Sequence, residues 1–202
     1  MKEILDRHVP ADAVAYCFEL WQRWQFDFIV TKARSSKLGD FRWAMGKREK
    51  ITVNGNLNPY NFLVTYLHEI AHLEVHRGYK RRQSAHGKAW KSHFQALLLP
   101  VMQPNVFPET VLIPLLDYAK NPRASSSSHI PLMLAFRAID KPTVNSNLLT
   151  VNDIAKGELF RFNNKIYLKG ETRRTRIVCT EQKTSKGFLF VAHAWVERVQ
   201  GR

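Results

Sequence analysis

Tyr66-Leu67-His68-Glu69-Ile70-Ala71-His72 is the stretch on which the fold and the chemistry of this sequence depend. It lies in an apolar segment that opens with Asn58-Pro59, and proline is favoured in the first turn of a helix. We therefore expect a helix from there to about His76, with Gly78 ending it. Histidines four residues apart lie one turn above each other on a helix, so both imidazoles can reach one ion. The stretch thus predicts a helix that carries a metal site.

Glu69, next to the first histidine, indicates the kind of metal site. A catalytic zinc ion keeps one coordination position for water and acidifies it, and a neighbouring glutamate accepts the proton as general base. The alternative is a helix that packs two histidines in its core. The sequence favours Zn²⁺ because a chance match would rarely fall inside an apolar helix that begins with proline. Donors for a reaction oxyanion stay open among Tyr60, His76, Tyr79 and Lys88.

The search for a third ligand first excludes two kinds of residue. His76 is on the same helix as His68, but a rise of about 1.5 Å per residue separates them by about 12 Å along the axis. Zinc–nitrogen bonds of about 2 Å cannot bridge that separation. Residues 75–108 contain no Asp or Glu, which excludes a carboxylate ligand from the next helix.

Two histidines of the following segment remain as candidates. His86 stands at the start of the next expected helix, after a chain reversal at residues 78–84 that lets it fold back beside His72. His93 lies two turns deeper, on the apolar face of that helix. We therefore expect His68, His72 and His86 to be the zinc ligands and His93 to be a packing neighbour.

The charge of the chain is strongly positive. Lys and Arg number 31 against 17 Asp and Glu, which gives a net charge of +14 over 202 residues. The counts are 18 basic and 11 acidic before residue 125, and 13 and 6 after it, so each part carries +7. Such a field attracts polyanions, and nucleic acid is the commonest polyanion that a basic protein meets. We expect DNA as a partner, although charge alone indicates no reaction.

Composition excludes several classes of protein. No uninterrupted apolar run, Ala96–Leu99 included, approaches the roughly 20 residues that cross a bilayer, so we expect no membrane segment. The first residues mix both charges and lack the apolar core of a secretory signal. Cys17 and Cys179 are too few for a disulfide framework or a four-cysteine zinc site. These features favour a cytoplasmic protein, and none of them indicates an oligomeric state.

The His68–His72 motif is accompanied by further characteristic segments before and after it in the sequence. His68-Glu69-Ile70-Ala71-His72 is followed, after thirteen residues, by His86-Gly87-Lys88-Ala89-Trp90. Upstream stand Leu38-Gly39-Asp40-Phe41-Arg42, Ile51-Thr52-Val53-Asn54 and Asn58-Pro59-Tyr60. In this combination the chain resembles the SprT-like (Spartan-type) zinc metalloprotease family. The resemblance covers roughly residues 10–100 and continues less distinctly to about residue 140.

The resemblance implies an α+β fold whose short zincin-like core consists of helices and a small antiparallel sheet. It implies a zinc-dependent endopeptidase in which three histidines hold the metal and Glu69 is the catalytic base. Animal members of the family act on proteins trapped on DNA, which agrees with the positive charge, so the expected substrates are DNA-associated proteins or peptides. Two alternatives stay open: a nucleic-acid-binding protein whose zincin core is structural or inactive, and a metal-dependent hydrolase of non-peptide substrates.

The composition and the apolar pattern of the sequence change along the chain, and these changes predict three structural parts. Residues 1–120 are expected to form the SprT-like zincin metalloprotease domain, residues 121–150 a linker with a short helix, and residues 151–202 a small basic all-β domain. Many similar family members end in a zinc ribbon of four cysteines, whereas the C-terminal part here has Cys179 alone. Short strands take that place, with an expected hairpin turn at Asn163-Asn164.

The C-terminal part mixes basic with aromatic residues. That composition suits a nucleic-acid surface, in which cations meet phosphates and rings stack on bases. The candidate phosphate-binding residues are Arg173, Arg174 and Arg176. The alternative is that the aromatic residues form the core of a small barrel and the cations a solvated face. For any single aromatic residue we expect the core.

Overall fold

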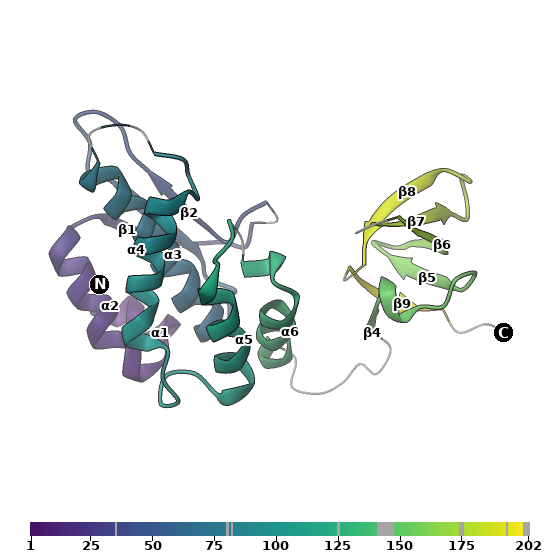
Figure 1. Ribbon diagram of the computed structural model, residues 1–202, viewed down its shortest axis with the longest axis horizontal. Helices are drawn as coiled ribbons and strands as arrows, with labels where there is room; N and C mark the ends of the chain where they lie inside the picture. The colour runs from purple at the N-terminus through teal and green to yellow at the C-terminus, as the bar shows by residue number, and fades with distance from the viewer. Residues whose placement is uncertain are drawn as a thin grey trace. The chain divides into compact units, whose positions relative to one another are not determined.

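The computed structural model divides the chain into two compact units, Met1–Pro142 and Thr143–Arg202 (Figure 1). It describes all residues except Ser35, Lys80, Arg82, Ser125, residues 141–147, Arg174, Thr175, His193 and residues 200–202. For Ser127, Leu148 and Trp195 the backbone alone is described. Each unit has a hydrophobic core of its own. The short helix expected within residues 121–150 belongs to the first unit, since the division lies after residue 142.

The first unit combines, in its described residues, six α-helices with a three-stranded sheet. None of the helices that the structure describes is long and apolar enough to span a bilayer. The elements in chain order are α1 (Lys2–His8), η1 (Ala11–Ala13), α2 (Val14–Trp24), β1 (Asp27–Thr31), β2 (Gly39–Arg42), β3 (Lys50–Asn54), α3 (Pro59–Gly78), α4 (Lys88–Leu98), η2 (Leu99–Val101), α5 (Glu109–Lys120), η3 (Ser126–Ser128) and α6 (Ile130–Asp140).

The sheet of the first unit is mixed, so the expectation of an antiparallel sheet is wrong for one of its two pairings. The strand order is β1-β3-β2, with β2 antiparallel and β1 parallel to β3. β3 takes the central place because it is the most deeply buried strand, with Ile51 and Val53 fully buried. Strand direction alternates along the chain, so β1 and β3 run in the same direction and β2 runs in the opposite one. Because β3 lies between β1 and β2, its pairing with β1 is parallel.

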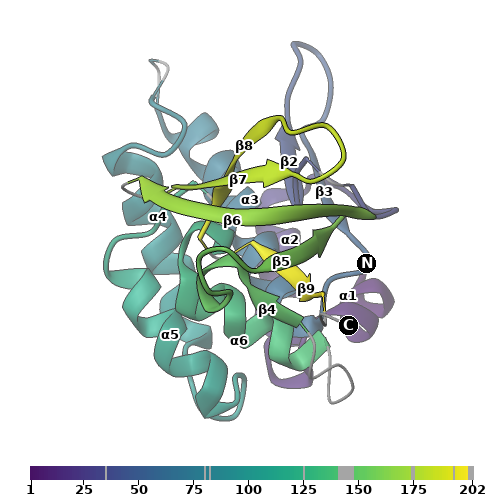
Figure 2. The same cartoon turned by 90° about the vertical axis from the view of Figure 1, so that its right-hand side faces the viewer.

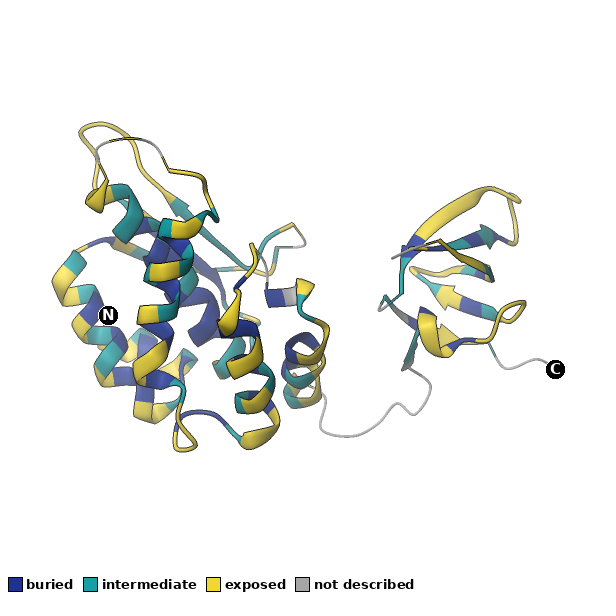
Figure 3. Ribbon diagram, in the orientation of Figure 1, coloured by how far each residue is buried: buried dark blue, intermediate teal, exposed yellow. Residues whose placement is uncertain are grey.

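α3 passes through the middle of the first unit and is buried along most of its length (Figure 3). The side-chain oxygen of Asn58 caps it by accepting a hydrogen bond from the backbone N–H of Asn61 at 2.9 Å, and Pro59 lies in the first turn. The predicted helix is confirmed, and Gly78 is its last residue. β2, β3 and α4 all pack on α3. Because neighbours cover it on several sides, its apolar residues are spread around the helix.

The second unit is an all-β unit, as predicted, whose described strands form one six-stranded sheet (Figure 2). The sheet order is β4-β9-β5-β6-β7-β8, and every described pairing is antiparallel. Asn163 and Asn164 both have positive φ angles, 47° and 61°, which confirms the predicted hairpin turn between β5 and β6. The elements are β4 (Leu148–Thr150), η4 (Val151–Asp153), β5 (Leu159–Phe162), β6 (Lys165–Arg173), β7 (Arg176–Glu181), β8 (Gly187–Val191) and β9 (Trp195–Arg198).

Candidate metal centre

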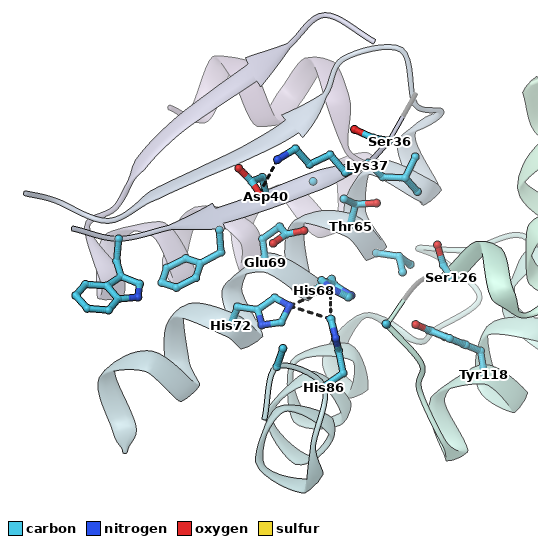
Figure 4. Close-up of a pocket in the computed structure, with 17 residues that line it drawn as sticks. Ser36, Lys37, Asp40, Thr65, His68, Glu69, His72, His86, Tyr118 and Ser126 are labelled. Atoms are coloured by element: carbon cyan, nitrogen blue, oxygen red, sulfur yellow. Dashed lines mark hydrogen bonds and ion pairs between the residues drawn. The ribbon is translucent and has the colours of Figure 1, made fainter. Parts of the chain in front are cut away.

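Three histidine side chains converge on one point in the first unit (Figure 4). The Nε2 atoms of His68 and His72 lie 3.2 Å apart. The Nε2 atom of His86 lies 3.1 Å from that of His72 and 3.2 Å from that of His68. His68 and His72 are one turn apart on α3. In the described part of the chain, no other three residues with metal-binding side chains come together in this way.

A tight turn before α4 presents His86 to the two histidines of α3. The backbone N–H of Gly87 donates to the carbonyl oxygen of Ser84 at 3.1 Å, and Gly87 is the N-cap of α4. The expected helix start at His86 is therefore wrong, since α4 begins at Lys88. A Cβ atom on Gly87 would lie 3.0 Å from the Cβ of Ser84, so the turn has no room for a larger residue without a shift. The expected return of His86 to the side of His72 is observed.

The spacing and protonation of the three nitrogens suit a tetrahedral metal ion. Zinc–nitrogen bonds of about 2.0–2.1 Å at tetrahedral angles separate the ligand nitrogens by about 3.3 Å. Burial lowers the pKa of His68 well below its usual range, and it lowers the pKa of His72 to about 4. Burial also lowers the pKa of His86. All three imidazoles are neutral at pH 7, which is the form of histidine that binds metal.

Trp90 of α4 supports all three histidines. Its ring centroid lies 4.6 Å from that of His68, 5.6 Å from that of His72 and 4.7 Å from that of His86. Trp90 is fully buried and stacks on Phe94, at 4.9 Å between ring centroids. In the sequence, Trp90 is recognisable only as the last residue of the His86–Trp90 motif, which does not predict this contact. The spacing of four residues between His86 and Trp90 could have indicated the contact. Helix geometry alone did not predict it, because His86 lies in the turn before α4.

Glu69 is buried beside the histidines, with 6% of its surface exposed. Burial raises the pKa of its carboxyl to about 8, and the negative charge of Asp40 contributes in the same direction. The backbone N–H of Phe41 in β2 donates a hydrogen bond to the carboxyl and acts in the opposite direction. The pocket therefore holds a carboxyl group whose protonated and ionised forms are both accessible near neutral pH.

Gly39 of β2 provides the space that Glu69 occupies. A Cβ atom on Gly39 would lie 2.5 Å from Oε1 of Glu69 and 2.8 Å from its Cγ. The same atom would lie 2.8 Å from Cγ2 of Thr65 on α3. Glycine at this strand position thus allows β2 to approach α3 closely. The motif Leu38–Arg42 contains Gly39, but the sequence alone does not predict this role for it.

A cavity of about 610 Å³ contains the histidines and Glu69. Its walls come from β2 and the residues on either side of it, from α3, from the turn before α4 and from the stretch between Tyr118 of α5 and Ser126 of η3. The lining residues are Ser36, Lys37, Leu38, Gly39, Asp40, Phe41, Trp43, Val64, Thr65, His68, Glu69, His72, Ala85, His86, Tyr118, Ala124 and Ser126. The histidines and Glu69 thus line an open pocket.

The other histidines of this region lie apart from the cluster. Nδ1 of His93 is 2.8 Å from Oε2 of Glu74, and His76 stacks on Trp43. His76 and Tyr79 line a second, neighbouring cavity. Of the remaining candidate oxyanion donors, Tyr60 packs on Phe107, and neither it nor Lys88 lines either cavity.

The candidate phosphate-binding residues of the second unit are only partly described. Arg173 and Arg176 are paired residues at the end of the β6–β7 hairpin and both are exposed, whereas Arg174 lies outside the described residues. Many other cations of this unit have partners. The ion pairs are Lys156–Glu171, Arg161–Glu197, Lys165–Glu181 and Arg198–Glu158, and buried Lys169 donates to two backbone carbonyl groups.

The aromatic residues of the second unit are mostly core residues. Phe160, Tyr167 and Phe190 are buried and pack on one another. Phe188 is partly exposed. The expectation that any single aromatic residue here belongs to the core is confirmed for the first three.

No protein-family model, no curated protein and no solved structure matches this chain significantly. The SprT-like resemblance therefore stays an expectation that depends on the motif residues. Because a fold does not determine a function, the chemistry of the site carries the functional conclusion.

Proposed function

We propose that the first unit is a zinc-dependent metalloendopeptidase of the SprT type, with Zn²⁺ held by His68, His72 and His86. One observation carries the proposal: a buried carboxyl group, Glu69, lies in the same open pocket as three converging neutral imidazoles. A purely structural zinc site is closed by four protein ligands and has no use for such a carboxyl group.

The residues of the pocket divide the chemistry among them. A divalent ion held by the histidines would acidify water and polarise a carbonyl group. Glu69 accepts a proton and returns it to the leaving amine, and a pKa near the working pH suits both steps. The Phe41 N–H holds the Glu69 carboxyl group in position, and the absence of a side chain at Gly39 leaves room for it.

The shape of the pocket favours a peptide as substrate. β2 is an edge strand of the sheet, and the segment from Ser36 to Phe41 lines the pocket. The free side of an edge strand can pair with an extended peptide, which places a backbone carbonyl group along the strand. This supports the cleavage of proteins over the hydrolysis of small non-peptide substrates.

Metal removal tests the proposed function directly. We expect about one zinc ion per chain in the purified protein, cleavage of DNA-binding proteins or of the chain itself, loss of cleavage after chelation, and recovery when zinc is added back. Metal content is measured by elemental analysis, and cleavage by gel and mass spectrometry, with and without single-stranded DNA. Stoichiometric zinc without cleavage under either condition would instead support the alternative, a nucleic-acid-binding protein with a structural site.

Replacement of Gly39 by alanine tests the positioning of Glu69. The added methyl group must displace the Glu69 carboxyl group, and a misplacement of about 1 Å costs on the order of 10²-fold in rate. We expect kcat to fall by about that factor while zinc content stays at the wild-type level, since the histidines are untouched.

Gly78→Ala is the matched control for this variant, because a Cβ atom there meets nothing within 4 Å. It should retain wild-type kcat. Equal kcat values for Gly39→Ala and the wild type would show that β2 does not position Glu69.

We also propose DNA as a partner that brings substrates to the pocket. The net charge of +14 supports this, because each cation that contacts a phosphate releases counterions. We expect the affinity for DNA to fall steeply with salt, with a log–log slope of about −0.7 to −0.9 per phosphate contact. Fluorescence anisotropy at several salt concentrations measures the slope, and binding that does not depend on salt would contradict the proposal.

We propose a cytoplasmic setting for this activity. Cys17 and Cys179 are both free and buried, and they lie in different units. Burial raises the pKa of both thiols, so they are unreactive core residues, as expected in a reducing compartment.

A further inference from the structure

The positive charge of the chain is concentrated in two segments of the first unit. Residues 37–50 contain 5 Lys and Arg and 2 Asp and Glu, and residues 75–91 contain 6 and none, so together they carry +9 of the net charge of +14. The first segment includes the hairpin between β2 and β3, and the second joins α3 to α4. Both connections lie at the same end of the first unit (Figures 1 and 2). The even division of charge about residue 125 concealed this concentration.

Both segments also carry exposed aromatic rings. Trp43 is 58% exposed and stacks on His76, with ring centroids 4.6 Å apart and planes at 26°. Tyr79 is 42% exposed. All three line a second cavity, of about 810 Å³, which shares Phe41 and His72 with the pocket of the metal centre. The cavity walls come from both basic segments.

Each of the two basic segments has a cation without an acidic partner among the described residues. Arg81 lines the second cavity, and Lys47 lies in the β2–β3 connection that also contains Trp43. Neither residue has an ion pair with any described acidic residue. Glu49, the nearest acidic residue in sequence to Lys47, is held by Arg77 through two hydrogen bonds. Lys47 and Arg81 are therefore available to an anionic ligand.

We propose that Trp43, Lys47, His76, Tyr79 and Arg81 form a binding surface for single-stranded nucleic acid, hereafter the aromatic–basic surface. Unpaired bases stack on Trp43 and Tyr79, and Lys47 and Arg81 contact the backbone phosphates. The inference deepens the proposed DNA partnership and does not depend on peptidase activity. It places the nucleic acid beside the pocket of the metal centre, within the same unit.

The combination of groups distinguishes the proposed ligand from other polyanions. An acidic peptide would need the cations but not exposed stacking rings. A duplex keeps its bases stacked on one another, so they are not available to rings that line a cavity. In the second unit, by contrast, many described cations are ion-paired and Phe160, Tyr167 and Phe190 are buried, so fewer of these groups are available to a ligand there.

Binding of a fluorescent oligo(dT) of about 15 nucleotides to full-length Glu69→Gln protein tests the proposal without turnover. We expect Trp43→Ala to weaken binding roughly 10- to 100-fold and Trp43→Phe to retain most of it, because base stacking needs a ring. Met45→Ala is the matched control, since Met45 is 94% exposed in the same hairpin and does not line the cavity; it should bind as the parent does. Duplex DNA and polyglutamate of similar length should bind more weakly than oligo(dT).

Two results overturn the proposal. One is oligo(dT) binding that Trp43→Ala leaves unchanged while Arg173→Gln with Arg176→Gln removes it, which would place the surface in the second unit. The other is that polyglutamate binds as tightly as oligo(dT) and that Trp43→Ala changes neither affinity. That result would indicate an acidic protein partner. If Trp43→Ala does not fold, Lys47→Gln with Arg81→Gln decides, because an unchanged salt slope in that variant excludes both phosphate contacts.

Discussion

Glu69→Gln is expected to lose about 10²- to 10⁴-fold in kcat while it keeps its zinc, because general acid–base catalysis contributes a factor of that size. The Glu69 carboxyl group lies against the Phe41 N–H of β2, and the three histidines form the converging ligand set without it. Glutamine has nearly the same shape and cannot take up a proton. Steady-state cleavage and elemental analysis of the same sample measure the two effects. Retained activity would remove Glu69 from the mechanism.

The same variant, which loses activity, should gain stability relative to the wild type at alkaline pH when no metal is bound. The pKa of Glu69 is about 8 in the folded protein against an ordinary value of 4.5, so the unfolded chain loses the proton first as the pH rises. Between these values the free energy of unfolding of the wild type falls by about 1.4 kcal/mol per pH unit through this group. Glutamine has no such dependence, so the stability of the variant relative to the wild type should rise from pH 5 to pH 9 by several kcal/mol.

Urea unfolding of both chelator-treated proteins at pH 5 and pH 9 measures this difference. A gap between variant and wild type that is the same at both pH values would show that Glu69 is ionised in the metal-free fold. Loss of activity together with an alkaline gain in stability is expected of a buried catalytic carboxyl group. Replacement of a residue that merely supports the fold would lower both the activity and the stability of the protein.

His86→Ala is expected to lower zinc affinity by more than about 100-fold. Loss of a residue that only orients a ligand already costs about 10- to 100-fold, and His86 supplies one of the three converging nitrogens. The two histidines of α3 that remain cannot complete a catalytic site, which has three protein ligands. Competition with a coloured chelator measures the affinity, and circular dichroism checks that the variant is folded.

His93→Ala is the control for His86→Ala, because it removes a histidine of the neighbouring helix that contacts Glu74 and is not in the cluster. It should keep wild-type zinc affinity. If His93→Ala loses the metal and His86→Ala keeps it, the ligand assignment is wrong. The two variants thus distinguish the two candidates that the sequence left for the third position.

The sequence predicted those parts of the site that depend on local periodicity. The helix with His68 and His72 follows from residue spacing and from the Asn58-Pro59 start, and the turn at Asn163-Asn164 follows from local turn preferences. The return of His86 could be expected because the charge and apolar patterns excluded other candidates. In each case the evidence lay within a short stretch of chain.

The features that the sequence did not reveal depend on contacts between distant segments. The parallel pairing of β1 with β3 depends on which strand is buried most deeply, and the role of Gly39 depends on the approach of β2 to α3. The partners of the cations in the second unit come from strand register, which composition does not encode. For the same reason, a count of charges on either side of residue 125 did not reveal the two basic segments, residues 37–50 and 75–91.

The indole of Trp90 has a consequence for metal exchange at the candidate site. Because Trp90 is fully buried and contacts all three imidazoles, the hydrophobic core fixes the ligands in place before any ion arrives. In small zinc modules the ion substitutes for a core, and its loss unfolds the chain. Here the first unit has a large core independent of the ion, so the site is a rigid template. We therefore expect an ion to load and leave while the protein stays folded, without the entropic cost of ordering the chain around it.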